Sequence, residues 1–221
     1  MATTRTRRLT SDARRDKLLA FGRRYFAAHG YDELSVDDLA AKAGVSKALV
    51  YHYFGGKRGL FVATIDRVAS DLELSMAPPG GLAFEQALRS SLGAFVGFIA
   101  ENAAIYRVML RGALGYDPEV QAITDRTRRA AVALVLAELR TTEPGPALSL
   151  AIAGWIGFVE SASLAWLDQR ARARDALDAS ALVEILVDAL AAVLPADHVP
   201  LPALAPTTTI GAAMARKGKR A

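Results

Sequence analysis

Residues that could perform catalysis are few in this chain and poorly placed for it. The histidines, His29, His52 and His198, have no helical spacing that would let two of them bind one metal ion, and there is no cysteine. Glycine-rich phosphate loops and nucleophile elbows are absent from the sequence. The adjacent Asp37 and Asp38 would point about 100° apart on a helix, which suits no acid and base pair. The sequence therefore predicts no catalytic residue, no metal site and no cofactor.

The segment from Val36 to Gly55, VDDLAAKAGVSKALVYHYFG, has the spacing of two short helices that cross at a steep angle. Such a pair needs a small residue at the contact and a residue that tolerates positive φ in the turn, which Ala40 and Gly44 provide. The apolar residues that would fasten both helices to a third are Leu39, Ala43, Val45, Val50 and Tyr53. The pattern predicts a helix-turn-helix, and a plain αα-hairpin with the same turn is the alternative.

The opposite side of the second helix carries side chains that could contact DNA. They are Lys47, Ala48, Tyr51 and His52, because 47 and 51, and 48 and 52, lie one turn apart. We expect this face to enter the major groove, with Lys47 donating to guanine O6 or N7. Ala48 and Leu49 are placed to meet a thymine methyl, and Tyr51 and His52 to reach phosphates or base edges. A solvated lysine is the alternative for Lys47.

Three more residues could contact the DNA backbone from helix starts. Ser35 and Ser46 precede the two short helices, where a serine hydroxyl caps the helix, and the amides behind Ser35 could also hold a phosphate. Asp38, three residues after Ser35, gives a start similar to a capping box. Lys57 opens the next helix, where its ammonium and the helix amino terminus could share one phosphate.

Nearly every other segment shows the helical period, so the fold class expected is all-α with about nine helices. We expect helices at 11–28, ending at Gly30, then at 36–43, at 47–53, and as one long helix after Gly55-Gly56. After the break at 78–81, a fifth helix includes residues 88–99, a sixth runs over 106–114, and a seventh runs from Pro118, capped by Asp117, to 139. An eighth includes 148–167, and a ninth runs from about 180 to 194.

Charge divides the chain unevenly. Residues 1–60 hold 12 lysines and arginines against 6 acidic residues, residues 61–210 hold 11 against 17, and residues 211–221 hold 4 against none. A basic amino-terminal part on an acidic body suits a phosphate-binding module joined to a different kind of domain. Arg5, Arg7 and Arg8 in the amino-terminal arm would track the DNA backbone, enter a minor groove, or serve only as a solubilising tail.

The stretch from Leu148 to Leu167 approaches the length of a membrane span but carries Glu160 and three serines. We interpret it as a helix buried in protein, with no membrane partner. The Arg-rich start lacks the apolar core of a secretory signal, and the absence of cysteine fits a reducing compartment. We therefore expect a cytoplasmic protein.

The amino-terminal region resembles the TetR family of transcriptional regulators over residues 12–62. The resemblance rests on the runs FAAHGY at 26–31, LSVDDLA at 34–40, AGVS at 43–46 and LVYHYF at 49–54, and on Lys57, Leu60 and Phe61. It implies a three-helix DNA-binding unit, a fourth connecting helix, and a helical body that dimerises and holds a small-molecule inducer. Gly55-Gly56 and Leu49 depart from common family residues, so no base preference is carried over.

Aromatic and apolar residues in successive helices of that body could line an inducer pocket. The predicted ligand-binding residues are Phe95, Phe98, Asn102, Tyr106, Met109, Trp155 and Phe158, with Arg107 and Glu160 as further polar groups. Ordinary core packing is the alternative. The composition favours an elongated, mostly apolar effector such as a lipid or acyl thioester. Small residues at Ala151, Gly154, Gly157, Ser161 and Ala165 predict that the eighth and ninth helices pair across a two-fold axis.

The sequence thus predicts four parts: a flexible basic arm (1–10), a helix-turn-helix domain (11–56), a helical regulatory and dimerisation domain (57–200) and a flexible basic tail (201–221). The predicted function is a ligand-responsive transcriptional regulator, a repressor that binds a palindromic DNA operator as a homodimer and is released by a small apolar inducer. A constitutive DNA-binding protein without an inducer is the main alternative, and an enzyme the remote one.

Overall fold

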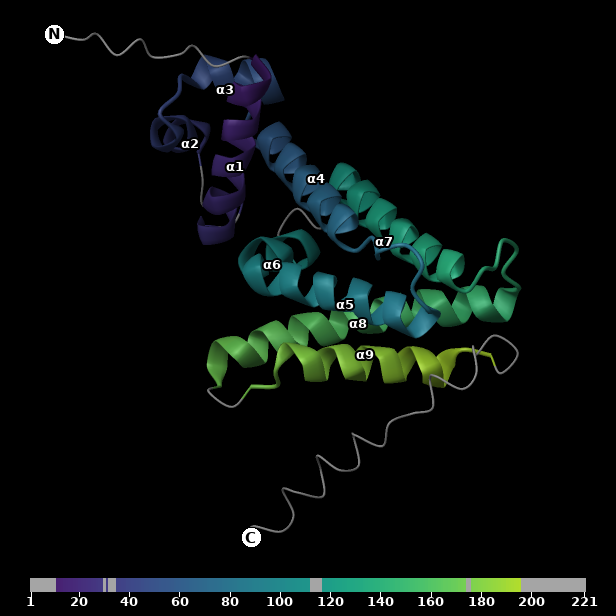
Figure 1. Cartoon of the computed structure of the whole chain (residues 1–221). Coiled ribbons are helices and arrows are strands. Elements are labelled where there is room, and N and C mark those ends of the chain that lie inside the picture. Colours follow the sequence, from purple (N-terminus) through teal and green to yellow (C-terminus); the bar gives the residue numbers. More distant parts are fainter. Residues whose placement is uncertain (1–10, 30, 32–34, 112–116, 174–175, 196–221) are drawn as a thin grey trace, which may run out of the picture. The chain divides into compact units, whose positions relative to one another are not determined.

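The computed structural model describes residues 11–29, 31, 35–111, 117–173 and 176–195, and this part of the chain is all-α (Figure 1). Within it lie nine helices and no strand, as the sequence predicts. Their bounds are α1 Ser11–His29, α2 Val36–Ala43, α3 Lys47–Phe54, α4 Lys57–Ser75, α5 Phe84–Glu101, α6 Ala103–Arg111, α7 Pro118–Glu138, α8 Pro146–Arg172 and α9 Ala179–Val193. The predicted arm and tail, Gly30 and His198 lie outside the described residues.

The chain forms two compact units. The described residues of 1–71 and 104–125 form the first unit, and those of 72–103 and 126–221 form the second. Helices α4 and α7 therefore each contribute to both units.

The ends of α2 and α3 follow from their local sequence. Ser35 caps α2 by accepting from the Asp38 amide over 3.0 Å, and Ser46 caps α3 by accepting from the Leu49 amide over 3.2 Å. Gly44 ends α2 with a φ of 67°, and Gly55 ends α3 with a φ of 72°. This left-handed conformation is the one that glycine adopts without steric cost, so both turns are fixed by residue type.

Helices α1 and α4 pack closely in the first unit. Phe26 of α1 meets Phe61 of α4 edge to face with ring centroids 5.0 Å apart, and both side chains are buried. A Cβ atom on Gly22 would lie 2.5 Å from Thr64 Oγ1, so the absence of a side chain at position 22 allows the close approach. A Cβ atom on Gly59 would lie 1.7 Å from the Phe54 carbonyl oxygen, so glycine also sets the contact between the end of α3 and the start of α4.

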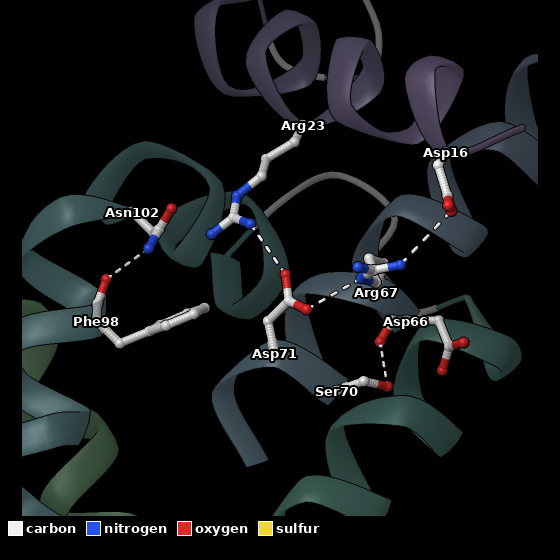
Figure 2. A network of polar contacts seen from close by, with 8 residues as sticks. All are labelled: Asp16, Arg23, Asp66, Arg67, Ser70, Asp71, Phe98 and Asn102. Carbon is white, nitrogen blue, oxygen red and sulfur yellow. Dashed lines mark hydrogen bonds and ion pairs between the residues drawn. The ribbon is translucent and has the colours of Figure 1, made fainter. Parts of the chain in front are cut away.

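A chain of ion pairs links the same two helices (Figure 2). Asp71 accepts from Arg23 of α1 over 3.1 Å and from Arg67 of its own helix over 3.0 Å, and Arg67 lies 3.6 Å from Asp16 of α1. The side chains are partly exposed, so each pair adds little stability by itself. Alternating signs along α1 and α4 favour one alignment of the two helices.

The start of α7 is fixed to the start of α4 by a second group of charges. Arg58 donates two hydrogen bonds to Asp117 and one to Glu119, each over 2.8 Å. Asp117 also caps α7, as predicted, by accepting from the Glu119 amide over 3.0 Å. Its side chain is 7% exposed, and the Arg58 guanidinium lowers the pKa of this carboxyl below its ordinary value.

The second unit is built around α5, α8 and α9, which pack on one another (Figure 1). Its most buried residues include Ile99, Ile152 and Leu186, each 0% exposed. The Trp155 indole N–H donates to the Leu186 carbonyl over 2.8 Å, which joins α8 to α9. Helix α8 is long enough and apolar enough to cross a membrane, judged by length and composition alone. Glu160 within this helix accepts hydrogen bonds from Arg128 at both of its carboxylate oxygens, each over 2.9 Å.

The structure places the sixth helix earlier than expected. It runs Ala103–Arg111 rather than from Tyr106 to Leu114, and residue 114 lies outside the described part. Asn102 is the C-cap of α5: its backbone amide still makes the helical bond to the Phe98 carbonyl, and its side-chain amide donates to the same oxygen over 2.8 Å (Figure 2). A new helix then begins at once.

Candidate nucleic-acid interface

The face of α3 predicted to contact DNA is exposed. Lys47, Ala48, Tyr51 and His52 are all exposed, with Tyr51 at 50%, whereas Val50 on the other side is fully buried. Leu49 lies at the edge of the face and is half-buried. A two-turn helix capped at both ends by Ser46 and Gly55 therefore presents four neighbouring side chains to solvent.

The inward residues are less uniform than the pattern suggested. Leu39 and Val50 are fully buried and Ala40 is 3% exposed. Ala43, Val45 and Tyr53 are only half-buried, as is the neighbouring Phe54. Charged and polar groups of α1 lie against the two aromatic rings: Ser11 Oγ is 3.2 Å from the Tyr53 hydroxyl, and the Arg15 guanidinium lies 5.4 Å from the Phe54 ring centroid.

Both predicted cap serines are used as caps. The Ser35 hydroxyl also donates to the Asp38 carboxylate over 2.5 Å. Asp38 therefore accepts a hydrogen bond from the Ser35 hydroxyl, whereas in a capping box it would accept from the Ser35 backbone amide. Both serines are exposed. The starts of α2 and α3, with their positive helix ends, therefore lie at the surface.

Lys57 stands at the first position of α4, as predicted, and contacts Tyr31. Its ammonium donates to the Tyr31 carbonyl over 3.1 Å and lies 4.0 Å from the centroid of the Tyr31 ring. The contact holds a cation at the amino terminus of α4. Sequence reasoning did not foresee the role of Tyr31.

Gly56 explains the double glycine that departs from common family residues. Its φ is 125°, and a Cβ atom there would lie 3.3 Å from the Tyr51 ring. The ring therefore packs against bare backbone, which gives Tyr51 a fixed support on the exposed face.

Asp37 of α2 contacts the exposed face of α3, and sequence reasoning missed this contact. Its carboxylate accepts a hydrogen bond from Lys47 Nζ over 2.9 Å, and this contact is the main cause of a raised pKa for the lysine. The sequence signal for this contact was a pair of opposite charges, with Asp37 in the first turn of α2 and Lys47 in the first turn of α3.

Among the described residues, no group of three or more histidine, aspartate and glutamate side chains could hold a metal ion. Neighbouring carboxylates raise the pKa of Lys47 at the start of α3 and of Arg58 at the start of α4, so both side chains stay cationic. Two capped helix starts and a row of exposed cationic, aromatic and small side chains can bind phosphates and base edges.

Two family models match the chain. Residues 18–64 match the bacterial regulatory proteins of the tetR family, and residues 84–193 match the tetracyclin repressor-like C-terminal domain. The crystal structure of a TetR-family transcriptional regulator from Streptomyces coelicolor is 33% identical, with a TM-score of 0.72, and the similarity covers 84% of this chain and 83% of that one. The chain belongs to the TetR family.

Named regulators of transcription are also similar to the chain. The transcriptional activator FasR from Mycolicibacterium smegmatis is 31% identical over 120 residues, which is 53% of this chain and 55% of FasR. The chain spans at most about half the length of the curated relatives that it matches. FadR from Bacillus subtilis, solved in complex with stearoyl-CoA, shares the fold with a TM-score of 0.64 at 15% identity, over 81% of this chain and 99% of FadR.

The matched family is one of bacterial regulatory proteins, and FasR is a regulator of transcription of the helix-turn-helix type. The matched family and relatives are regulators rather than enzymes. Residues 36–54 hold the helix-turn-helix itself, and the exposed residues of α3 are the four derived above from spacing.

The predicted effector-binding residues of this TetR-family chain fall in both units. Tyr106 and Met109 on α6 are buried in the first unit. The others lie in the second unit, where Phe95 is buried, Phe98 and Asn102 are half-buried, Trp155 is 4% exposed and Phe158 is 42% exposed. Asn102 caps α5 and Trp155 is bonded to α9, so each already has a structural role.

Two surface hollows lie in the second unit. One, of about 380 Å³ between α7 and α8, is lined by Val132, Leu136 and Ile156 with the Arg128–Glu160 pair beside them. The other, of about 620 Å³, is a groove between α8 and α9; its lining residues include Leu150, Gly154, Phe158 and Val193. Gly157 faces the first hollow, whereas Gly154 faces the groove.

Proposed function

We propose that this TetR-family protein is a repressor that binds a palindromic operator as a homodimer, with one α3 of each protomer in the major groove. The carrying observation is the exposed face of α3, where Lys47, Ala48, Tyr51 and His52 stand on a helix with both ends capped. Repression needs only that the bound dimer cover a promoter, so no further contact with the transcription machinery is required. Such a protein acts in the cytoplasm, where the bacterial chromosome lies.

Each residue of the face has a separate task. Lys47 donates to a guanine edge, Ala48 and Leu49 meet thymine methyls, and Tyr51 and His52 bind phosphates or base edges. The capped helix starts at Ser35 and Ser46, together with Lys57 at the start of α4, bind the phosphate backbone and set the register of α3.

The groove between α8 and α9 is the proposed dimer interface. Leu150, Phe158 and Val193 are 76%, 42% and 45% exposed there, which leaves large apolar side chains in water on one protomer. Gly154 and Ala151 leave room for a second backbone to come close. A two-fold axis through this groove pairs α8 and α9 with their copies and presents two α3 helices to half-sites about 10 base pairs apart.

An apolar effector releases the operator in this proposal. The effector site rests on the predicted residues that share the second unit, chiefly Phe95, Phe98 and Trp155. Helix α4, which belongs to both units, carries the change to the DNA-binding helices. FadR, which shares this fold, was solved in complex with stearoyl-CoA, an elongated acyl ligand. A coupling of about 1–3 kcal/mol between the two sites would weaken operator binding about 5–150-fold.

Selection of bound sequences from a random DNA pool tests the proposal. We expect enrichment of one palindrome whose half-sites are separated by a whole number of helical turns. Effector candidates are then titrated against this DNA while tryptophan emission is followed, because Trp155 and Trp166 both lie in α8. Failure to enrich any sequence would refute the operator, and an enriched single half-site would refute the dimer. A ligand that saturates the tryptophan signal without weakening operator binding would leave a constitutive DNA-binding protein.

A further inference from the structure

An ion pair joins the first turns of the two helices of the helix-turn-helix. Lys47 Nζ of α3 donates to Asp37 Oδ2 of α2 over 2.9 Å. The side chains are 50% and 68% exposed, and a pair this exposed adds little to folding stability. Its place on the proposed DNA-reading face points to a different use.

A carboxylate on that face opposes DNA binding by its charge alone. Each phosphate of the duplex is negative, and non-specific affinity comes from cations that replace bound counterions. Asp37 therefore weakens contact with any DNA, whatever its sequence. The cost is offset where the carboxylate improves discrimination between sequences, because base readout depends on where a donor points as well as on its charge.

We propose that Asp37 is a positioning residue for specificity: its carboxylate holds the Lys47 ammonium at the base edges and keeps it off the phosphates. The inference rests on the proposed function of the α3 face. It adds a residue of α2 to the recognition surface and assigns that residue no base contact of its own.

The geometry supports this role in two ways. A free lysine side chain samples many rotamers and loses this freedom when it binds, whereas Lys47 is already restrained by its partner on the neighbouring helix. The pair also has no net charge, so on a random sequence Lys47 gains little from a phosphate that it would have to leave Asp37 to reach. Only an acceptor in the right place, such as guanine O6 or N7, accepts one of the remaining ammonium hydrogens while the pair stays intact.

Removing the carboxylate should therefore raise general affinity and lower specificity together. The test compares wild type with Asp37→Asn on a duplex enriched by selection and on a scrambled duplex of the same composition, over a series of salt concentrations. For Asp37→Asn we expect tighter binding to scrambled DNA, a salt dependence steeper by about 0.9 for one freed cation, and a specificity ratio at least about fivefold lower. Asp37→Glu, which keeps a carboxylate, should retain much of the ratio.

Asp38→Asn is the matched control. It removes the same charge one residue further along α2, but Asp38 contacts the Ser35 hydroxyl and not Lys47, and asparagine keeps an oxygen that accepts from that hydroxyl. We expect this variant to bind both duplexes more tightly by the same factor, with an unchanged ratio. Equal behaviour of the two variants would overturn the proposal, because Asp37 would then contribute only its charge.

Lys47→Ala separates positioning from direct readout. In that background Asp37→Asn should leave the specificity ratio unchanged, since no lysine remains to be positioned. A fall in the ratio as large as in wild type would overturn the proposal and make Asp37 a base-reading residue. A wild-type protein that fails to distinguish the two duplexes would overturn the proposed function itself, before any variant is made.

Discussion

Gly154→Arg should stabilise the isolated fold and abolish the dimer. Apart from its chain neighbours and the backbone of its own helix, an ideal Cβ atom at Gly154 has no described atom within 4 Å, and the residue lies on the exposed side of α8. Arginine is a better helix former than glycine by about 0.8 kcal/mol, so the protomer gains helix stability. The same side chain would place two guanidinium groups in the proposed two-fold interface.

The size of the effect follows from the exposed side chains of the groove. The exposed fractions of Leu150, Phe158 and Val193 are 76%, 42% and 45%, equivalent to roughly one and a half fully exposed side chains on each protomer. Burying them on two protomers contributes about 5–10 kcal/mol before the cost of association is subtracted. Burying an unpaired guanidinium costs several kcal/mol, so the dissociation constant of the dimer should rise by about a thousandfold or more.

Sedimentation at micromolar concentration measures the oligomeric state, and thermal unfolding measures the stability of the protomer. Gly93→Arg on α5 is the matched control, because Gly93 is also an exposed helical glycine with open space at its Cβ position and lies outside the groove. We expect dimers for wild type and Gly93→Arg, and monomers for Gly154→Arg. An unaltered dimer of Gly154→Arg would refute the α8–α9 interface.

Three further predictions concern the first unit. Gly22→Ala should destabilise the protein by about 1–2 kcal/mol, because the new methyl would lie about 0.9 Å closer to Thr64 Oγ1 than an ordinary van der Waals contact allows. In a Thr64→Ala background, where this clash is removed, the same change should stabilise the helix. Lys57→Ala should weaken binding to selected and scrambled DNA alike, with a salt dependence lower by about one unit. Asp117→Asn should be less stable than wild type at neutral pH. This difference should shrink as the pH falls below about 4 and vanish only below the pKa of folded Asp117, because that pKa is lowered and the contribution is lost on protonation.

Chemical denaturation in both backgrounds measures the glycine prediction, and an equal effect of Gly22→Ala in each would contradict the proposed clash. Titration of DNA at several salt concentrations tests the Lys57→Ala prediction, and a loss of affinity confined to the selected duplex would make Lys57 a base-reading residue. Unfolding free energies across the acid range measure the third. A wild-type advantage that does not decline as the pH falls below the ordinary pKa of aspartate would show that Asp117 acts through packing.

The helix-turn-helix was predictable because its determinants are local. Ser35, Gly44 and Ser46 fix the limits of α2 and the start of α3 by hydrogen bonds within a few residues, and the structure confirms α2 at Val36–Ala43. The four exposed residues of α3 follow from helical spacing alone once Val50 is assigned to the core.

Contacts between distant residues escaped the sequence. The Asp37–Lys47 pair depends on how α2 meets α3, and the Trp155 indole bonds a carbonyl 31 residues away. Periodicity identified apolar faces in α5 and α8 without revealing which helices they meet. The start of α6 was misplaced because hydrophobic spacing does not mark Asn102, the residue that caps α5 directly before α6 begins.

The most direct test of the central claim is to repeat the selection from random DNA with Lys47→Ala beside wild type. The account predicts that both proteins enrich a palindrome and that their base preferences differ at one position in each half-site, placed symmetrically about the centre. An identical profile for the two proteins would contradict the assignment of the exposed α3 face as the surface that reads DNA.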